Sequence, residues 1–196
     1  MLEREKYELM KQKYSNVGSW AIWGLQGATP KSNTDNMSWV RDPDLLLTIN
    51  TGYIFVGLNW SRGDISYGGQ IPWANFHSGS PHQNDFKLRY ALRGTKYWGS
   101  YITDIIKLHS EPDSSKVKSY IRQHPEVIEK NIKEFVNEIT ILGENNTLIA
   151  LGNDVYDILN EWLGKEYKIV KIMHYSNHIS KEKYRDLILD TLNRYQ

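Results

Sequence analysis

The chain has 196 residues, of which 40% are hydrophobic and 12% aromatic, so it is long and apolar enough for one globular domain rather than a disordered segment. It contains no cysteine, which excludes disulfides, Cys-ligated zinc, iron–sulfur clusters and thiol nucleophiles. No apolar run approaches the roughly 20 residues that span a bilayer, and the start of the chain is unlike a secretory signal. We therefore expect a cytoplasmic protein with a single domain over residues 1–196.

The formal net charge is only +1, but it is unevenly distributed along the chain. Residues 59–107 and 164–196 each carry a net charge of +3, whereas residues 108–163 carry −5 and residues 1–58 are neutral. If the two basic segments meet in the fold, they would form a positive face for a polyanion. Taken alone, the counts favour the simpler interpretation, which is ordinary variation among solvated charges.

Four apolar runs of strand length follow an N-terminal part of about fifty residues, which we expect to pack on the domain as a helical and aromatic extension. The first and third runs are nearly continuous, as in strands that are covered on both faces. The four predicted strands are Tyr53–Leu58, Tyr101–Leu108, Thr147–Leu151 and Tyr167–Met173.

Helical patterns lie between and after these strands. The alternation of strands and helices predicts an α/β fold, a three-layer sandwich around a central, mostly parallel four-stranded sheet. The polar segment 75–85 is expected to be a long loop, and such loops are often functional. The predicted helices are Phe86–Leu92 with Asn84 or Asp85 as a cap, a helix from Pro125 to Gly143, one over residues 155–162 that ends at Gly164, and a last one capped by Ser180.

Polar side chains follow the first and the last predicted strand, where a buried apolar run stops abruptly. Ligands of parallel sheets bind beyond the carboxyl ends of the strands, so both groups should share one edge of the sheet. The first group is Asn59, Trp60 and Arg62, and the second is His174, Tyr175 and Ser176.

Four segments together resemble the uracil-DNA glycosylase superfamily. "GLNWSRG" (Gly57–Gly63) is similar to its first motif, especially the Gly-x-Asn-Pro-Gly form of the mismatch-specific and thymine-specific enzymes. "HYSNHIS" (His174–Ser180) is similar to its second motif, usually His-Pro-Ser followed by a wedge residue. "YITDIIK" (Tyr101–Lys107) resembles the second-strand segment, and "LIALGNDVYDIL" (Leu148–Leu159) resembles the third strand and the helix after it.

The segments occur in the family's order over roughly residues 53–192, but four positions depart from its pattern. These departures concern the shape of the pocket and the choice of base. Trp60 and Ser61 replace the proline and the second glycine of the first motif, Tyr175 replaces the proline of the second, and Asp104 stands where several members have asparagine.

The resemblance implies a monofunctional DNA glycosylase that hydrolyses the N-glycosidic bond of a flipped-out uracil or of a modified base, including cytosine-like ones. In that reaction Asn59 would orient the attacking water, and His174 would donate a hydrogen bond to the departing base. Considered without the resemblance, Asn59 is a residue that ends a strand in a turn, and His174 is a structural histidine.

A flipped-out base needs a pocket with an aromatic side chain to stack on. The resemblance places that aromatic in the segment of Trp73 and Phe76 without deciding between them, and it brings Trp60 and Asp104 to the base as well. An ionised Asp104 only accepts hydrogen bonds, so it would suit an exocyclic amine better than O4 of uracil. The alternative is that Asp104 points away from the pocket and pairs with Lys107 or Arg62.

The resemblance also implies contacts with duplex or single-stranded DNA. His178 and Ile179 stand where the family has its wedge, and Ser176 and Lys181, at the start of the last helix, would hold phosphates together with Arg62. We expect a monomer with no membrane partner, no cofactor and no metal, because His174 and His178 suit zinc only on a helix. The alternatives are a non-catalytic DNA-binding or base-sensing module and, less favoured, a nucleotide hydrolase, for which no Gly-rich phosphate loop is found.

Overall fold

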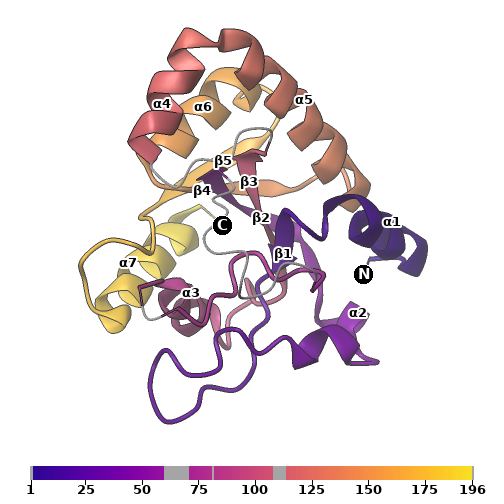
Figure 1. Ribbon diagram of the computed structural model, residues 1–196, viewed down its shortest axis with the longest axis vertical. Helices are drawn as coiled ribbons and strands as arrows, with labels where there is room; N and C mark the ends of the chain where they lie inside the picture. Colours follow the sequence, from indigo (N-terminus) through magenta and orange to yellow (C-terminus); the bar gives the residue numbers. More distant parts are fainter. Residues whose placement is uncertain (1, 60–70, 81, 108–113, 196) are drawn as a thin grey trace.

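The computed structural model describes residues 2–59, 71–80, 82–107 and 114–195, and it is an α/β fold built on a five-stranded mixed sheet (Figure 1). The strand order is β1-β3-β2-β4-β5, in which β1 runs antiparallel to β3 and the other neighbours are parallel. The strands are β1 (Gly18–Trp20), β2 (Asn50–Asn59), β3 (Ser100–Ile106), β4 (Thr147–Leu151) and β5 (Lys168–Ile172).

The sheet has one strand more than the sequence predicted. Strands β2 to β5 correspond to the four predicted runs, whereas β1 comes from the N-terminal part and pairs Gly18 with Thr103 and Trp20 with Tyr101. A three-residue strand is too short to show an alternating pattern in the sequence. Its pairing with β3 therefore depends on a tertiary contact, and the expected four-stranded sheet is corrected to five strands.

Helices pack on both faces of the sheet (Figure 1). Helices α4, α5 and α6 cover one face, and α3 and α7 cover the other. The helices are α1 (Arg4–Tyr14), the 3-10 helix η1 (Ser38–Arg41), α2 (Leu45–Thr48), α3 (Asp85–Leu92), α4 (Ser114–Gln123), α5 (Pro125–Leu142), α6 (Asn153–Leu163) and α7 (Lys181–Arg194).

The helix ends follow the expected local chemistry in most cases. Pro125 occupies the first turn of α5, and Gly143 ends that helix with a φ of 127°, a conformation that favours glycine. The Ser180 hydroxyl accepts a hydrogen bond from the Lys183 amide at 3.2 Å, which confirms the predicted cap of α7. Neither Asn84 nor Asp85 caps α3 through its side chain, because the Asp85 carboxylate accepts from the Ser78 amide instead.

Alternate residues of the central strands enter two separate cores, as period-two side-chain geometry requires. In β2, Ile54 and Val56 join the core under α4, α5 and α6, whereas Phe55 joins the core under α3 and α7. All three side chains are fully buried. Burial on both faces explains why this strand is apolar without interruption in the sequence.

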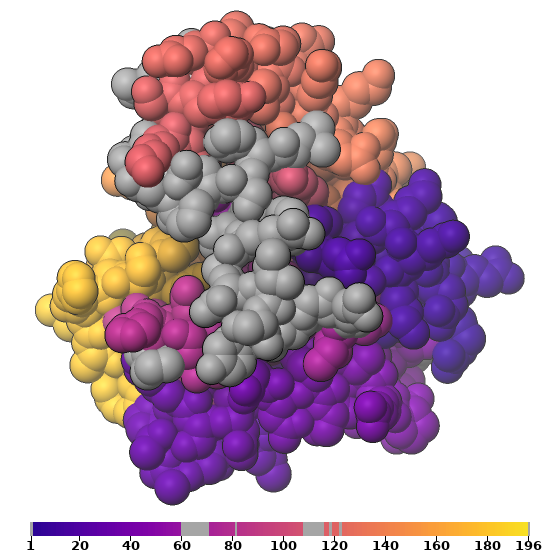
Figure 2. Space-filling model, viewed as in Figure 1, coloured from indigo at the N-terminus to yellow at the C-terminus, as the bar shows by residue number. Residues whose placement is uncertain are grey.

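The first fifty residues cover the lower and right-hand parts of the view in Figure 2. Helix α1 packs against α5, where the Tyr14 hydroxyl donates to Oε1 of Glu134 at 2.8 Å. No helix in the described ranges is long and apolar enough to cross a membrane.

A buried histidine links this N-terminal part to the segment before α3. His77 lies between the rings of Trp23 and Trp39, and its Nε2 is 2.8 Å from Oγ of Ser19. The Ser19 hydroxyl donates to the Trp73 carbonyl at 2.6 Å, so it accepts from Nε2–H of a neutral His77. Burial lowers the pKa of His77 to about 3.

We predict that His77 makes the protein less stable as the pH falls from 6.5 towards 3. The unfolded chain takes up a proton in this range and the folded chain does not, so at pH 5 the loss should be about 2 kcal/mol. Urea unfolding of the wild type and His77→Gln between pH 7.5 and 5 measures it, because the difference in stability between the two proteins should change by about 2 kcal/mol over this range, whereas the other titrating groups act equally in both. Parallel pH profiles of the two proteins would contradict the prediction.

Candidate functional site at the carboxyl edge of the sheet

The chain changes its winding direction between β2 and β4. From β2 it passes through α3 to β3 on one side, and from β4 it passes through α6 to β5 on the other side. The two connecting helices lie on opposite faces of the sheet. In open α/β sheets, ligands bind in the crevice beyond the carboxyl ends of strands at such a point. Asn59 is the last residue of β2, and Gly152 directly follows β4.

The strand register brings Asn59 and His174 to the same edge. Val56 is level with Ala150, and Ala150 is level with Lys171. Asn59 lies three residues beyond Val56, and His174 lies three residues beyond Lys171. The end of β4 is between them, so their backbones are two strand spacings apart, which corresponds to about 10 Å. Gly152 leaves room between them, since a Cβ atom at this position would lie 3.7 Å from Cβ of His174.

Asp104 is a buried acidic group at this edge. It pairs in register with Gly57, and a Cβ atom on Gly57 would lie 2.2 Å from its Oδ1 and 3.6 Å from Cε1 of Phe76. The Asn75 amide is 3.4 Å from Oδ2 of Asp104 and is held in place by donating to the Val17 carbonyl at 2.7 Å. The Asp104 side chain is therefore directed into the space above Gly57 and beside Phe76.

The Asp104 carboxyl holds a proton more strongly than an ordinary aspartate. Burial raises its pKa to about 7, against the opposing effects of the Lys107 charge and the Asn75 hydrogen bond, and Glu138 raises it further. A carboxyl with this pKa is protonated in about half of the molecules at neutral pH. It can then donate one hydrogen bond and accept another.

Only one of the two aromatic candidates lies at this site. Trp73 is completely buried, its Nε1 donates to the Tyr7 hydroxyl at 3.1 Å, and its ring packs against Trp20 and Tyr101. Phe76 is half-buried beside Asp104. Trp73 is thus a core residue rather than a stacking surface, and the structure favours Phe76 for that role.

The loop that carries both aromatics has an unusual backbone. Trp73 and Phe76 have φ values of 70° and 64°, in the left-handed region that large side chains seldom adopt. Such conformations cost free energy and tend to occur where the surroundings fix a side chain for a function. For Phe76, this conformation directs the ring over the carboxyl edge.

His174 presents one ring nitrogen to the site. Its Nδ1 accepts from the Ser176 amide at 3.1 Å and lies 2.8 Å from Oγ of Ser176, so the proton of the neutral ring is on Nε2. Burial lowers the pKa of His174 to about 4, which keeps the ring neutral at physiological pH. The ring stacks on Tyr175 with centroids 4.3 Å apart. Within the described ranges, Nε2 contacts no hydrogen-bonding partner, so it can donate to a ligand.

Tyr175, which the sequence predicted at this edge, interacts electrostatically with Asp85, for which the sequence suggested a helix cap but no role in the site. Burial raises the pKa of Tyr175 well above its usual value, and the charges of Asp85 and Asp104 add to the effect. Burial also raises the pKa of Asp85 to about 6. The only signal in the sequence was an aromatic residue directly after His174 in a polar loop.

The predicted DNA-contacting residues have mixed surroundings. Ser176 is bound to His174, and His178 is exposed. Ile179 is half-buried against the core under α3 and α7, so it does not project as a wedge. Lys181 pairs with Glu182, and its ammonium lies 4.5 Å from the centre of the Tyr90 ring. The other two predicted residues, Trp60 and Arg62, lie outside the described residues.

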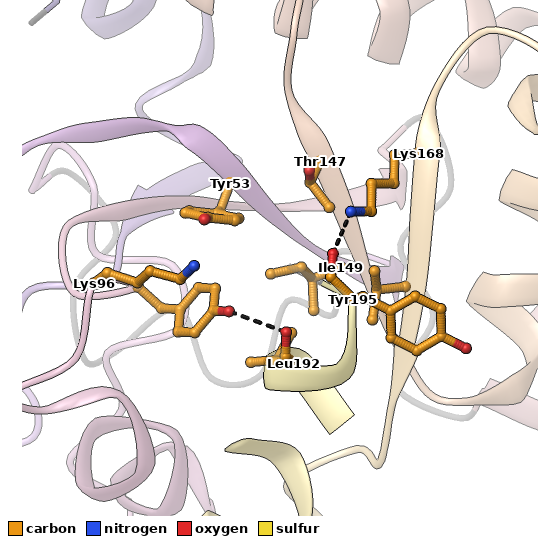
Figure 3. A pocket seen from close by; sticks show the side chains of 9 residues that line it. Tyr53, Lys96, Thr147, Ile149, Lys168, Leu192 and Tyr195 are labelled. Carbon is orange, nitrogen blue, oxygen red and sulfur yellow. Dashed lines mark hydrogen bonds between the residues drawn. The ribbon is translucent and has the colours of Figure 1, made fainter. Parts of the chain in front are cut away.

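Two cavities lie away from this edge. One of about 240 Å³ is at the amino ends of β2, β4 and β5, where Tyr53, Lys96, Lys168 and Tyr195 surround an apolar floor (Figure 3). Another of about 390 Å³ adjoins Trp23. Neither contains a residue predicted for the site, and in the described part of the chain no three His, Asp or Glu side chains are grouped to hold a metal ion.

Comparison with protein-family models, curated proteins and solved structures finds no match for this chain.

We predict that Gly57→Ala disturbs the site through Asp104. The added methyl group would lie 2.2 Å from Oδ1, so the carboxyl must move, at a cost of about 1–3 kcal/mol. Thermal unfolding measures the cost, and a crystal structure of the variant shows the displacement. Gly52→Ala is the matched control on the same strand, since its added methyl group would come no closer than 3.3 Å to another atom, the amide oxygen of Asn50. Equal stability of the two variants would contradict the prediction.

Proposed function

We propose that the protein is a monofunctional DNA glycosylase with a uracil-DNA glycosylase-like, three-layer α/β fold. It would hydrolyse the N-glycosidic bond of a flipped-out uracil or of a modified base. The observation that carries this proposal is that these residues lie at one edge of the sheet. Asn59 and His174 lie on either side of the end of β4. Asp104, on the neighbouring strand β3, lies beside Phe76.

The chemistry requires groups of these types. As the bond between C1′ and the base breaks, its electron pair leaves with the base, and the sugar becomes an oxocarbenium ion. A water oxygen then bonds to C1′ and releases its proton to solvent. The Asn59 amide oxygen orients this water. The Nε2–H of His174 donates to the base oxygen where negative charge develops, and a neutral imidazole suits that role because it remains a donor throughout.

A flipped-out base would bind beside Phe76 and Asp104. Phe76 supplies an aromatic surface, and base–aromatic stacking contributes about 1–3 kcal/mol. A protonated Asp104 offers a donor and an acceptor together, which matches O4 and N3–H of uracil. An ionised Asp104 only accepts, which matches the exocyclic amine of a cytosine-like base. The raised pKa of Asp104 therefore allows both preferences, each in its own pH range.

DNA as the partner is supported by cations whose charges are not paired with acids. The two basic segments meet where α3 packs on α7. Arg89 donates to the carbonyls of Pro30 and Ser32, and Arg185 donates to three carbonyls at the end of α3. Lys87 donates to the Asn177 carbonyl. Lys87 and Arg89 are buried, so they would add to a positive potential rather than contact phosphates, and this potential would favour association with a polyanion. We propose that the protein binds DNA as a monomer.

The alternative is a non-catalytic DNA-binding or base-sensing module. The observation in its favour is that an amide, Asn59, stands at the water-orienting position, and an amide is too weak a base to activate water strongly. Binding of duplexes with altered bases, without any base release, would favour this alternative.

We predict that Asn59→Ala and His174→Ala each reduce the single-turnover rate of base release about 10²–10³-fold, because each removes a group that acts on the reacting atoms. Duplexes carrying altered bases, cleaved with alkali at abasic sites, report the rate. The exposed residues Asn160 and His82 provide matched controls as alanine variants. Wild-type rates for both site variants would reject the assigned roles.

We predict that base preference depends on pH through Asp104. Release of uracil should be favoured below pH 7 and release of a cytosine-like base above it, because the carboxyl changes from donor and acceptor to acceptor only. Asp104→Asn should make uracil release independent of pH and weaken activity on the cytosine-like base. Rates on both duplexes at pH 6 and pH 8 test this. A variant with an unchanged pH dependence would exclude Asp104 as the base reader.

A further inference from the structure

Glu138 is a completely buried carboxylate on α5. Its Oε1 accepts from the Tyr101 hydroxyl at 2.7 Å and from the Thr103 hydroxyl at 2.8 Å. Its Oε2 lies 2.7 Å from Nζ of Lys107 in an ion pair that is not aligned as a hydrogen bond. Two hydroxyl donors and one cation stabilise the ionised form, which a buried carboxylate needs if it is to keep its charge.

Lys107 stands between Glu138 and Asp104. Its ammonium donates to the backbone carbonyl of Asp104 and lies 5.3 Å from the centre of the Phe135 ring. The backbone amide of Lys107 donates to Oδ1 of Asn131 at 2.7 Å, which ties the end of β3 to α5. Because its side chain is only 5% exposed, the ammonium depends on these neighbours rather than on water.

Lys107 thus pairs with the Glu138 carboxylate but contacts Asp104 only at its backbone carbonyl. Only one of the two carboxyls has strong donors. Glu138 receives two hydroxyls at 2.7 and 2.8 Å, whereas the Asp104 carboxyl receives the Asn75 amide at 3.4 Å. The negative charge is more stable on Glu138, so the single cation is balanced there.

We propose that Glu138 is a positioning residue that pairs with the Lys107 ammonium and thereby keeps this cation from pairing with the Asp104 carboxyl. The use of the Asp104 carboxyl in reading a base rests on the proposed function. The coupling between Glu138, Lys107 and Asp104 does not.

Other charged or titratable groups also face Asp104. Tyr175, from the segment after β5, interacts electrostatically with both Asp104 and Asp85, and Asp85 lies at the start of α3. Neither the Asp85 carboxyl nor the Tyr175 phenol can supply a positive charge in place of Lys107. Among the described groups for which the structure resolves an effect on Asp104, Lys107 is the cation and Glu138 is the anion.

The test is the pKa of Asp104, measured by ¹³C NMR in protein labelled at aspartate carboxyls. In Glu138→Gln the buried ammonium loses its anion and should take Asp104 as its partner, so the pKa of Asp104 should fall by roughly 1–3 units. The pH above which uracil release declines should fall by the same amount. The control is Glu134→Gln, one turn earlier on α5, which removes a charge but keeps an acceptor for the Tyr14 hydroxyl and should leave the pKa of Asp104 unchanged.

A double variant, Lys107→Met with Glu138→Gln, separates charge from packing. With both charges removed, burial and the Asn75 hydrogen bond still act on Asp104 but the opposing cation is gone, so its pKa should equal or exceed the wild-type value. If Glu138→Gln does not fold, this variant still decides, because a pKa below the wild-type value would overturn the proposal. A pKa that stays constant or rises in folded Glu138→Gln would overturn it too.

The coupling of Asp104 to Glu138 and the glycosylase activity can be tested separately. If the pKa of Asp104 falls as expected but no duplex loses a base at any pH, the coupling stands and the glycosylase proposal is rejected. If bases are released but the pKa of Asp104 does not respond to Glu138, the coupling is rejected and the glycosylase proposal stands.

Discussion

The position of β2 between β3 and β4 is the constraint on which the rest of the structure depends. Both neighbours run parallel to it, so every connection must cross a face of the sheet, and helices bury both faces. The same pairing places Gly57 against Asp104 and sets the end of β2 beside the end of β4. The grouping of these residues at the carboxyl edge is thus a direct consequence of the strand order.

Buried charge is the second organising feature, and it extends from the α5 face of the sheet to the carboxyl edge. Glu138 and Lys107 form an ion pair beneath β3, and the Lys107 ammonium reaches the carbonyl of Asp104. Buried ion pairs contribute little net stability compared with apolar packing. A pair that is retained beside a protonatable carboxyl is better explained by its effect on that carboxyl than by stabilisation of the core.

The unusual backbone before α3 connects packing with the site. Trp73 is held in the N-terminal core by Tyr7 and Trp20, and Ser19 binds its carbonyl. Three residues later, Phe76 is at the carboxyl edge. The first residues of the chain, which looked like an added extension, therefore anchor the loop that supplies an aromatic surface to the site.

The sequence by itself determined the four central strands, most of the helices and the shared edge of Asn59 and His174, because these follow from local periodicity and from the rule for parallel sheets. It also contained a sign of Glu138, a charge on the apolar face of α5 beside Phe135 and Ile139. Only the tertiary structure decided the fifth strand, the burial of Trp73 in the core and the raised pKa of Asp104. Each of these depends on groups distant in sequence. Strand β1 pairs with β3, and Trp73 donates a hydrogen bond to Tyr7. The pKa of Asp104 depends on its burial and on the charges of Lys107 and Glu138.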